Sequence, residues 1–304
     1  MNPNRLRSYF YLIIVAAIWG AAGPVIKFTL QGIDPLPFLT YRLLISAIFS
    51  VIFFAIKIKN GKKFKRLRAN LPLSFTYGLL AVPMALGILF LGLDKSSVLD
   101  LSLIGLIGPL MITAGGAYFF RDHITKREKI GIAVVSCGVI LNSIFPIFGS
   151  NSGAKLTGNL LLLIFLIADS GSTLISKRAV QKKIKSANLT NFAFIIGVIT
   201  IVPLTLAIYG INNLSYIIIT LPLKYHLGVW YMALLSGNLA YFLYVRGQRS
   251  IEVSEAILFQ YLQPVFMIPL AIFWLKESLT ISFVLGGAII AIGLTIAEYK
   301  KSKK

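Results

Sequence analysis

Long apolar stretches separated by short polar segments make up most of the 304-residue chain. A helix rises about 1.5 Å per residue, so about 20 apolar residues cross a hydrocarbon core of about 30 Å. Ten stretches reach that length, which predicts an all-α polytopic membrane protein with ten transmembrane helices. The predicted helices span residues 9–28, 37–56, 71–91, 97–119, 129–148, 157–176, 189–209, 227–245, 253–274 and 281–298.

The composition supports this interpretation and points to a different explanation of the net charge than nucleic-acid binding. Apolar residues make up 57% of the chain and charged residues only 13%, far below the charged share of a soluble protein. The 30 Lys and Arg against 10 Asp and Glu leave a charge of +20, which in a soluble protein would suggest nucleic-acid binding. Because these basic residues cluster between the apolar stretches, we expect no nucleic-acid partner and contact with anionic lipid headgroups instead.

The basic clusters also predict an orientation. Twenty-four of the 30 Lys and Arg fall at the two chain ends and in alternate loops, and four fall in the other loops. Basic residues concentrate in the cytoplasmic loops of membrane proteins. The alternation therefore predicts a multi-pass protein of the cell membrane, with basic tails at residues 1–7 and 299–304 that both lie in the cytoplasm.

An internal repeat becomes visible when the sequence is shifted by 155 positions. The shift aligns Pro109 with Pro264 and the basic-acidic pair Arg121-Asp122 with Lys276-Glu277. Further pairs in the same register are Asp100 with Glu255, Thr125 with Thr280, Gly131 with Gly286, and Gly138 with Gly293. The predicted repeats span residues 8–148 and 156–298. Each holds five helices, an odd number, so the second repeat would enter the membrane from the opposite side, as in inverted-repeat transporters.

Several residues in both halves follow the pattern of a known family. They are Trp19-Gly20, Lys27, Pro35, Arg42, and the stretch from Ser254 through Pro264, Lys276-Glu277, Leu279-Thr280 and Gly286 to Gly293. This pattern resembles the EamA family of the drug/metabolite transporter superfamily. The resemblance implies a ten-helix carrier of small metabolites such as amino acids, built from two inverted five-helix repeats. The chain departs from the family at Arg121-Asp122, where a small residue and Glu are usual, and at Ser170-Gly171, where Trp-Gly is usual.

Polar groups inside the predicted helices are the candidates for substrate binding, because each is costly in hydrocarbon. Asp169 lies near the middle of the sixth helix with Thr173 on the same face. It would bind a cationic group or a proton, or else form a hydrogen-bond seam between helices. Aromatic walls with a few amides are usual in small-molecule pockets. The further candidates for such a pocket are Trp19, Asn238, Tyr241, Gln260 and Gln263.

Four charged residues are candidates for a gate or an anion contact. Lys27 and Arg42 lie inside the first two predicted helices, toward their outer ends, and anchoring at the membrane interface is the alternative. Asp100 and Glu255 lie at repeat-related helix starts, where stabilisation of the helix N-terminus is the alternative. Pro109 and Pro264 are expected to kink their helices.

We expect no metal site and no cofactor. The single cysteine, Cys137, and the two histidines, His123 and His226, offer no ligand set at metal spacing. The sequence contains no phosphate-binding loop of the form G-x-x-x-x-G-K-[ST], so transport energy would come from a gradient or from a partner.

These features predict a secondary active transporter, not an enzyme, that works by alternating access around a midplane cavity. Amino acids or related polar metabolites are the favoured substrates, and export is the favoured direction. One alternative is an intramembrane enzyme, although the predicted helices contain no histidine base and only one deep aspartate. The other is an auxiliary scaffold subunit. The substrate, the coupling ion and the oligomeric state, monomer or homodimer, stay open.

Overall fold

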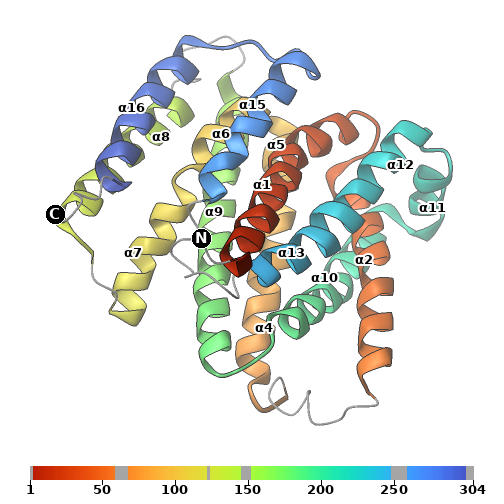
Figure 1. Cartoon of the computed structure of the whole chain (residues 1–304). Helices are drawn as coiled ribbons and strands as arrows, with labels where there is room; N and C mark the ends of the chain where they lie inside the picture. The colour runs from red at the N-terminus through yellow and green to blue at the C-terminus, as the bar shows by residue number, and fades with distance from the viewer. Residues whose placement is uncertain (1–2, 59–67, 122–123, 145–151, 248–258, 299–304) are drawn as a thin grey trace.

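The computed structural model describes residues 3–58, 68–121, 124–144, 152–247 and 259–298, and the secondary structure in these ranges is helical (Figure 1). The first half contains α1 (Pro3–Thr29), α2 (Pro35–Ile58), α4 (Leu71–Leu79), the π-helix η2 (Leu80–Leu86), α5 (Gly87–Lys95), α6 (Val98–Gly105), α7 (Gly108–Phe120) and α8 (Lys126–Ile144). The second half contains α9 (Ser152–Gln181), α10 (Ser186–Tyr209), α11 (Ile211–Ile219), α12 (Leu223–Trp230), the π-helix η4 (Tyr231–Leu239), α13 (Ala240–Gly247), the 3-10 helix η5 (Phe259–Leu262), α15 (Gln263–Phe273) and α16 (Ile281–Glu298).

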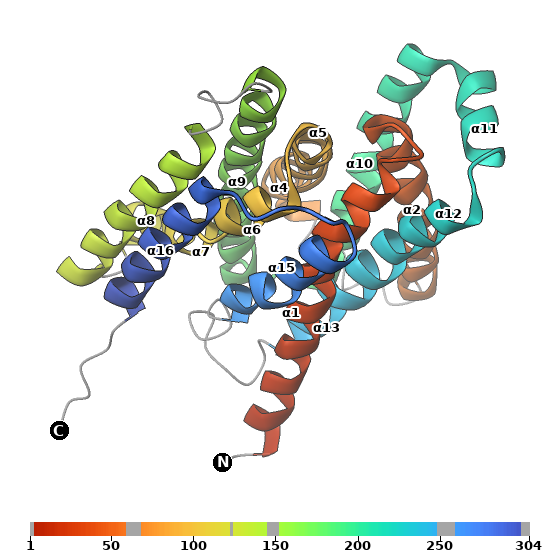
Figure 2. The ribbon, with the colours of Figure 1, turned by 90° about the horizontal axis from the view of Figure 1, so that it is seen from above.

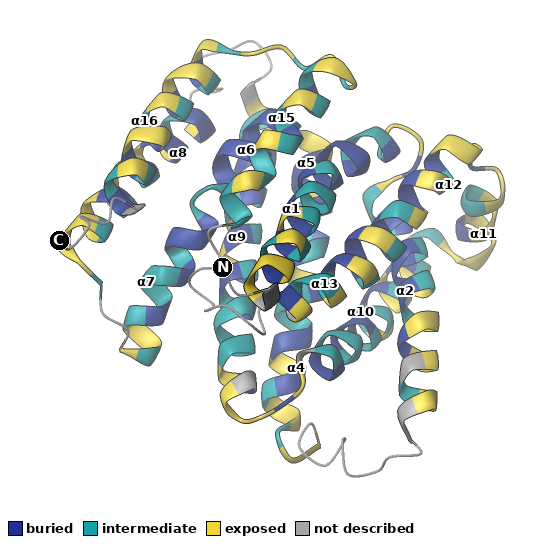
Figure 3. Cartoon of the chain, in the orientation of Figure 1, coloured by how far each residue is buried: buried dark blue, intermediate teal, exposed yellow. Residues whose placement is uncertain are grey.

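The helices form a membrane protein in two halves. In the described ranges, seven helices are long and apolar enough to cross a membrane, and two shorter apolar helices span Phe259–Phe273 and Ile281–Ala297. Large apolar side chains such as Ile48, Ile199 and Phe273 are exposed on outward helix faces, many of which are yellow in Figure 3. A soluble protein rarely exposes so much apolar surface, so these faces suit lipid. The count of ten crossings stays a prediction.

Three of the predicted spans are interrupted. The third consists of α4, η2 and α5 with Pro83 inside the π-helix, and the eighth consists of α12, η4 and α13. π-Helical turns insert an extra residue and are frequent at functional sites. The fourth span breaks between α6 and α7. Pro109 lies in the first turn of α7 and Pro264 in the first turn of α15. Each proline lies where a new α-helical segment begins inside a continuous apolar helix, so its missing N–H costs nothing, and the expected kink stays a prediction.

The two halves repeat local backbone structure as well as sequence. Arg121 and Lys276, which correspond in the 155-position register, both adopt the left-handed conformation, with φ of 59° and 58°. Few non-glycine residues do so. The helices before them, α7 and α15, begin at the corresponding residues Gly108 and Gln263. The repeat therefore extends to these helix starts and to the left-handed residues that follow the helices.

The contact between α8 and α16 is reciprocal. A Cβ on Gly131 would lie 2.6 Å from the Gly293 carbonyl oxygen, and a Cβ on Gly138 would lie 3.0 Å from the Gly286 carbonyl oxygen. In the repeat register Gly131 corresponds to Gly286 and Gly138 to Gly293, so each contact maps onto the other. Such a contact indicates a pseudo-two-fold axis between two antiparallel helices, and both views show α8 and α16 side by side (Figures 1 and 2).

One helix was not anticipated from the sequence. Residues 210–219, which the span pattern left as a loop, contain α11, which begins after Gly210 in the left-handed region at φ 72°. α11 has nine residues, too few to cross a membrane. Ile211, Tyr216 and Ile219 are exposed and Leu214 is buried, a distribution that suits a helix lying in the membrane interface.

Candidate functional site

An aromatic cluster joins the two halves at the centre of the bundle. The Trp19 ring of α1 packs against Tyr241 and Tyr244 of α13, with ring centroids 5.3 Å and 5.2 Å apart. Trp19 Nε1 also donates a hydrogen bond of 3.1 Å to the Ser236 carbonyl oxygen of η4. A π-helix displaces backbone carbonyls from the regular α-helical pattern, and this carbonyl holds the indole in place.

A small cavity of about 10 Å³, with room for about one water molecule, opens beside this cluster. Trp19, Tyr244, Gln260 and Gln263 contribute to its wall, together with the apolar residues Leu12, Val15, Ala16 and Phe259. The Gln260 amide lies 3.5 Å from the Tyr244 hydroxyl. The structure thus brings together Trp19, Gln260 and Gln263, three of the residues that the sequence analysis proposed for substrate binding.

The residue after Trp19 allows this arrangement. A Cβ on Gly20 would lie 2.7 Å from the Gln263 carbonyl oxygen, so any larger residue would push α15 away from α1. The Trp19-Gly20 pair therefore places a large ring beside the cavity and keeps the two helices in close contact.

Charged groups surround Tyr241. Asp169 of α9 and Arg42 of α2 both interact with it electrostatically, and Tyr77 of α4 interacts with Asp169. Asp169 is half-buried. Its neighbour Thr173, one turn along α9, takes no part in the contacts described for this cluster. A carboxylate and a guanidinium that both act on one aromatic side chain can recognise opposite charges on one small molecule.

Arg42 is not a membrane anchor. Only 2% of the residue is exposed, whereas an arginine that snorkels to the interface keeps its guanidinium in water. Its guanidinium lies over the Phe90 ring, 5.7 Å from the centroid. The Arg42 Nε and Nη1 atoms, like Asn238 Nδ2 of η4, are buried without a hydrogen-bond partner.

Lys27 has a partner inside the protein. Its Nζ donates hydrogen bonds of 2.8 Å and 2.9 Å to the carbonyl oxygens of Leu93 and Asp94. These carbonyls end α5, where a cation satisfies unpaired acceptors and the helix dipole. Lys27 therefore ties α1 to the end of α5.

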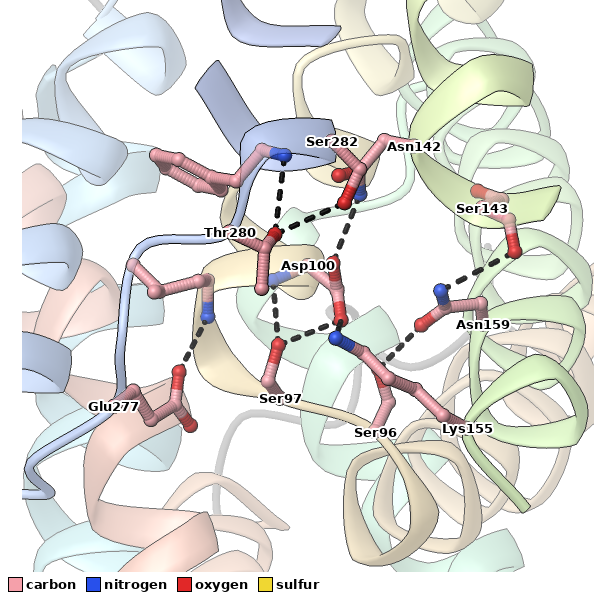
Figure 4. A network of polar contacts seen from close by, with 12 residues as sticks. Ser96, Ser97, Asp100, Asn142, Ser143, Lys155, Asn159, Glu277, Thr280 and Ser282 are labelled. Carbon is pink, nitrogen blue, oxygen red and sulfur yellow. Dashed lines mark hydrogen bonds and ion pairs between the residues drawn. The ribbon is translucent and has the colours of Figure 1, made fainter. Parts of the chain in front are cut away.

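Asp100 is the centre of a polar network that joins the two halves (Figure 4). Its carboxylate accepts hydrogen bonds from Ser97 Oγ at 2.6 Å and Asn142 Nδ2 at 2.9 Å, and forms an ion pair with Lys155 Nζ at 3.1 Å. Ser97 in turn caps α6, since its Oγ accepts from the Asp100 N–H. Asp100 thus supports a helix start and also contacts α9 of the second half.

Glu277 completes this network and was missed as a site residue. Its two carboxylate oxygens accept the N–H groups of Val98 and Leu99, at 2.8 Å and 2.9 Å. The basic-acidic pair in the repeat register was the available signal. Nearby, Ser96 Oγ donates to Asn159 Oδ1. We call this set the polar seal: Ser96, Ser97, Asp100, Asn142, Lys155, Asn159 and Glu277.

The polar seal and the cavity lie toward opposite ends of α1. The cavity is lined by residues from Leu12 to Trp19, whereas Lys27, which contacts the end of α5 just before the seal, lies about 12 Å further along the helix. The repeat partner of Asp100, Glu255, lies outside the described residues.

The sequence profile of the EamA-like transporter family matches the chain twice, over residues 6–144 and 156–298. The chain belongs to this family. An "Uncharacterized transporter" of Archaeoglobus fulgidus is 24% identical over 97% of the chain and all of its own length. "Uncharacterized transporter YwfM" of Bacillus subtilis is 28% identical over 97% of this EamA chain and 94% of its own. The "Probable amino-acid metabolite efflux pump" of Salmonella typhimurium is 24% identical, with 94% and 93% covered.

A solved crystal structure has the same fold as this EamA protein. It has a TM-score of 0.62 and 13% sequence identity, and the alignment covers 97% of this chain and 98% of the other. The family match and the named relatives identify a membrane transporter of the drug/metabolite transporter kind, and the solved structure shows its fold.

Proposed function

We propose that this protein is a secondary active transporter that exports small polar metabolites, with amino acids and related compounds favoured, by alternating access. The observation that carries the proposal is the cluster at the centre of the bundle, where Trp19 and Arg42 of the first half meet Asp169 and Tyr241 of the second. A site built from both halves can change its exposure when the halves move relative to each other.

The ten-helix inverted architecture is part of the proposal. The pseudo-two-fold relation of α8 and α16 supports it, because two repeats related by an axis in the membrane plane run in opposite directions. The basic loops support an arrangement with both termini in the cytoplasm. In this orientation the end of α1 that carries Lys27 faces outward and its Arg5 end faces the cytoplasm.

The positions of the polar seal and the cavity fit one of the two access states. The seal would close the outer end, because Lys155, Asn159 and Glu277 of the second half contact Ser96, Asp100 and α6 of the first. The cavity lies on the cytoplasmic side of the seal. The structure therefore supports a state that is closed to the outside.

The export direction and the substrate class also draw on similarity. The relative from Salmonella typhimurium carries the name of an amino-acid metabolite efflux pump. The opposite charges of Arg42 and Asp169, which both act on Tyr241, suit a molecule with both an anionic and a cationic group.

Counterflow in proteoliposomes tests the proposal. Purified protein is reconstituted alone, and exchange is measured for a panel of radiolabelled α-amino acids, with and without a pH gradient. We expect saturable exchange of at least one panel member without ATP, lost in Trp19→Ala and kept in Cys137→Ser, which changes an exposed residue of α8. No exchange by the wild-type protein would contradict the proposed substrate class, and a requirement for a second protein would favour the scaffold alternative.

A further inference from the structure

Several buried hydrogen-bond donors between α2 and η4 have no acceptor. Arg42 Nε, Arg42 Nη1, Ser46 Oγ and Asn238 Nδ2 are each buried and without a hydrogen-bond partner. An unpaired buried donor costs about 1–3 kcal/mol, and more when it is charged. Native proteins contain few such groups, so a concentration of them indicates a site whose acceptor is supplied from outside the chain.

These donors lie at one contact between the two halves. Arg42 and Ser46 are one turn apart on α2 and so share a face. A Cβ on Gly237 of η4 would lie 3.6 Å from Ser46 Oγ, and the next residue of η4 is Asn238. Tyr241, which follows in α13, interacts electrostatically with Arg42. Ser46 therefore lies where α2 of the first half packs against η4 of the second, Arg42 lies one turn away on α2, and Asn238 belongs to the same π-helix.

The missing partner carries negative charge. Among the residues that the structure describes, no carboxylate forms an ion pair with Arg42, and Asp169, whose charge also acts on Tyr241, is not its partner. The Phe90 ring offsets only part of the cost of burying a guanidinium. Guanidinium, hydroxyl and amide N–H groups together suit a small planar oxyanion, and arginine pairs with carboxylates more strongly than with neutral acceptors.

We propose that Arg42, Ser46 and Asn238 form a subsite for the carboxylate group of the transported compound. The inference rests on the proposed transport function and narrows it to substrates that carry a free carboxylate. Because the donors come from both halves, a bound carboxylate contacts both repeats, and its binding energy differs between two arrangements of those repeats. Replacing the carboxylate by a carboxamide removes the charge that the subsite requires.

Two serines of α2 provide a matched pair of variants. Ser46→Ala removes a donor that has no partner, so the protein keeps its stability while the subsite loses a contact. Ser50→Ala, one turn along the same helix, removes a hydroxyl whose single hydrogen already has two acceptors in reach, the Ser46 carbonyl oxygen and Asn191 Oδ1. It therefore serves as the control. Arg42→Gln removes the charge, and Arg42→Lys keeps the charge without the planar group.

Ligand-induced thermal stabilisation of the purified full-length protein measures the subsite without transport. The probes are α-amino acids and, for each, the carboxamide with the same side chain, at constant ionic strength. We expect wild type and Ser50→Ala to be stabilised by at least one amino acid and not by its carboxamide. Affinity falls at least about tenfold in Arg42→Gln and about three- to tenfold in Ser46→Ala. Arg42→Lys retains part of the binding.

Each outcome decides the proposal. Equal binding of carboxylate and carboxamide, unchanged affinity in both Arg42→Gln and Ser46→Ala, or no stabilisation of the wild type by any probe overturns the carboxylate subsite. If Arg42→Gln fails to fold, the comparison of ligand affinity in Ser46→Ala with that in Ser50→Ala still tests the subsite. Counterflow with the same preparations separates the two proposals. If binding depends on Arg42 but no exchange occurs, the subsite stands and the transport proposal is contradicted. If exchange occurs but depends neither on Arg42 nor on a carboxylate, transport stands and the subsite is contradicted.

Discussion

Glu277 connects the second half to the start of α6, so replacing it tests the proposal that the polar seal closes the outer end. Its carboxylate accepts two backbone N–H groups, from Val98 and Leu99, at 2.8 Å and 2.9 Å. The first N–H groups of a helix have no partner within the helix. Glu277→Gln keeps the shape of the side chain but leaves one acceptor oxygen and no charge.

The magnitude follows from these two bonds. The variant loses one charge-assisted hydrogen bond, worth about 1.5–3 kcal/mol, and the attraction of a carboxylate to a helix N-terminus, worth about 0.3–1 kcal/mol. Glu277 is only half-buried, and water that reaches the freed N–H returns part of this energy. A net loss of about 1.5–3 kcal/mol would raise the ratio of open to sealed protein about 10- to 150-fold.

Thiol labelling from outside the cell reports that ratio. Val98 is fully buried beneath Glu277, so Val98→Cys in a Cys137→Ser background provides a reporter that a membrane-impermeant maleimide reaches only when the seal opens. The control is Glu128→Gln. Glu128 accepts the Thr125 N–H at 2.7 Å at the start of α8, so it is a similar carboxylate cap within one half.

The expected result is labelling about 10- to 150-fold faster in Glu277→Gln and unchanged in Glu128→Gln. Equal rates in wild type and Glu277→Gln would show that the cap does not hold the halves together. Faster labelling in both variants would point to general loosening of the helices, and the proposed seal would be wrong.

Three further predictions concern the core of the site, the topology and the helix packing. Asp169→Asn should express normally and lower transport or shift its pH dependence; unchanged uptake kinetics across pH would remove Asp169 from the mechanism. Single cysteines at the exposed positions Arg68 and Gly153 should label from opposite sides of the membrane, with position 68 cytoplasmic, and labelling from one side would contradict the inverted topology. Gly131→Ala should lower stability by about 1–3 kcal/mol, because its Cβ would meet the Gly293 carbonyl oxygen; an unchanged melting temperature would show that α8 and α16 yield at this contact.

The sequence predicted the helices well because apolar length is a strong and local signal. It did not predict the interruptions. Leu80–Leu86 and Tyr231–Leu239 are as apolar as their flanks, so hydropathy does not distinguish a π-helical segment from an α-helical one. Pro109 and Pro264 marked the breaks correctly in position, but whether a proline bends a helix or begins a new one depends on the turn before it.

Some residues that line the cavity were candidates from the sequence, but their pairings were not predictable. Rings and amides rare in membrane helices pointed to Trp19, Gln260 and Gln263, which the cavity brings together. The partners of Lys27 and Glu277 are backbone groups, the carbonyls that end α5 and the N–H groups that begin α6. No residue type identifies such partners, since they depend on which helix ends meet in space.

The repeat register predicts counterparts of two polar-seal residues in the other repeat. Glu277 corresponds to Asp122 and Asp100 to Glu255, and both counterparts lie outside the described residues. If the halves exchange conformations between access states, these carboxylates would seal the cytoplasmic end when the outer end is open. Asp122→Asn would then destabilise the outward-open state and slow the external labelling of Val98→Cys, whereas Glu277→Gln makes this labelling faster. The variant that carries both substitutions would label at a rate closer to that of the wild type. Faster labelling in Asp122→Asn would mean that the two ends do not alternate by this exchange.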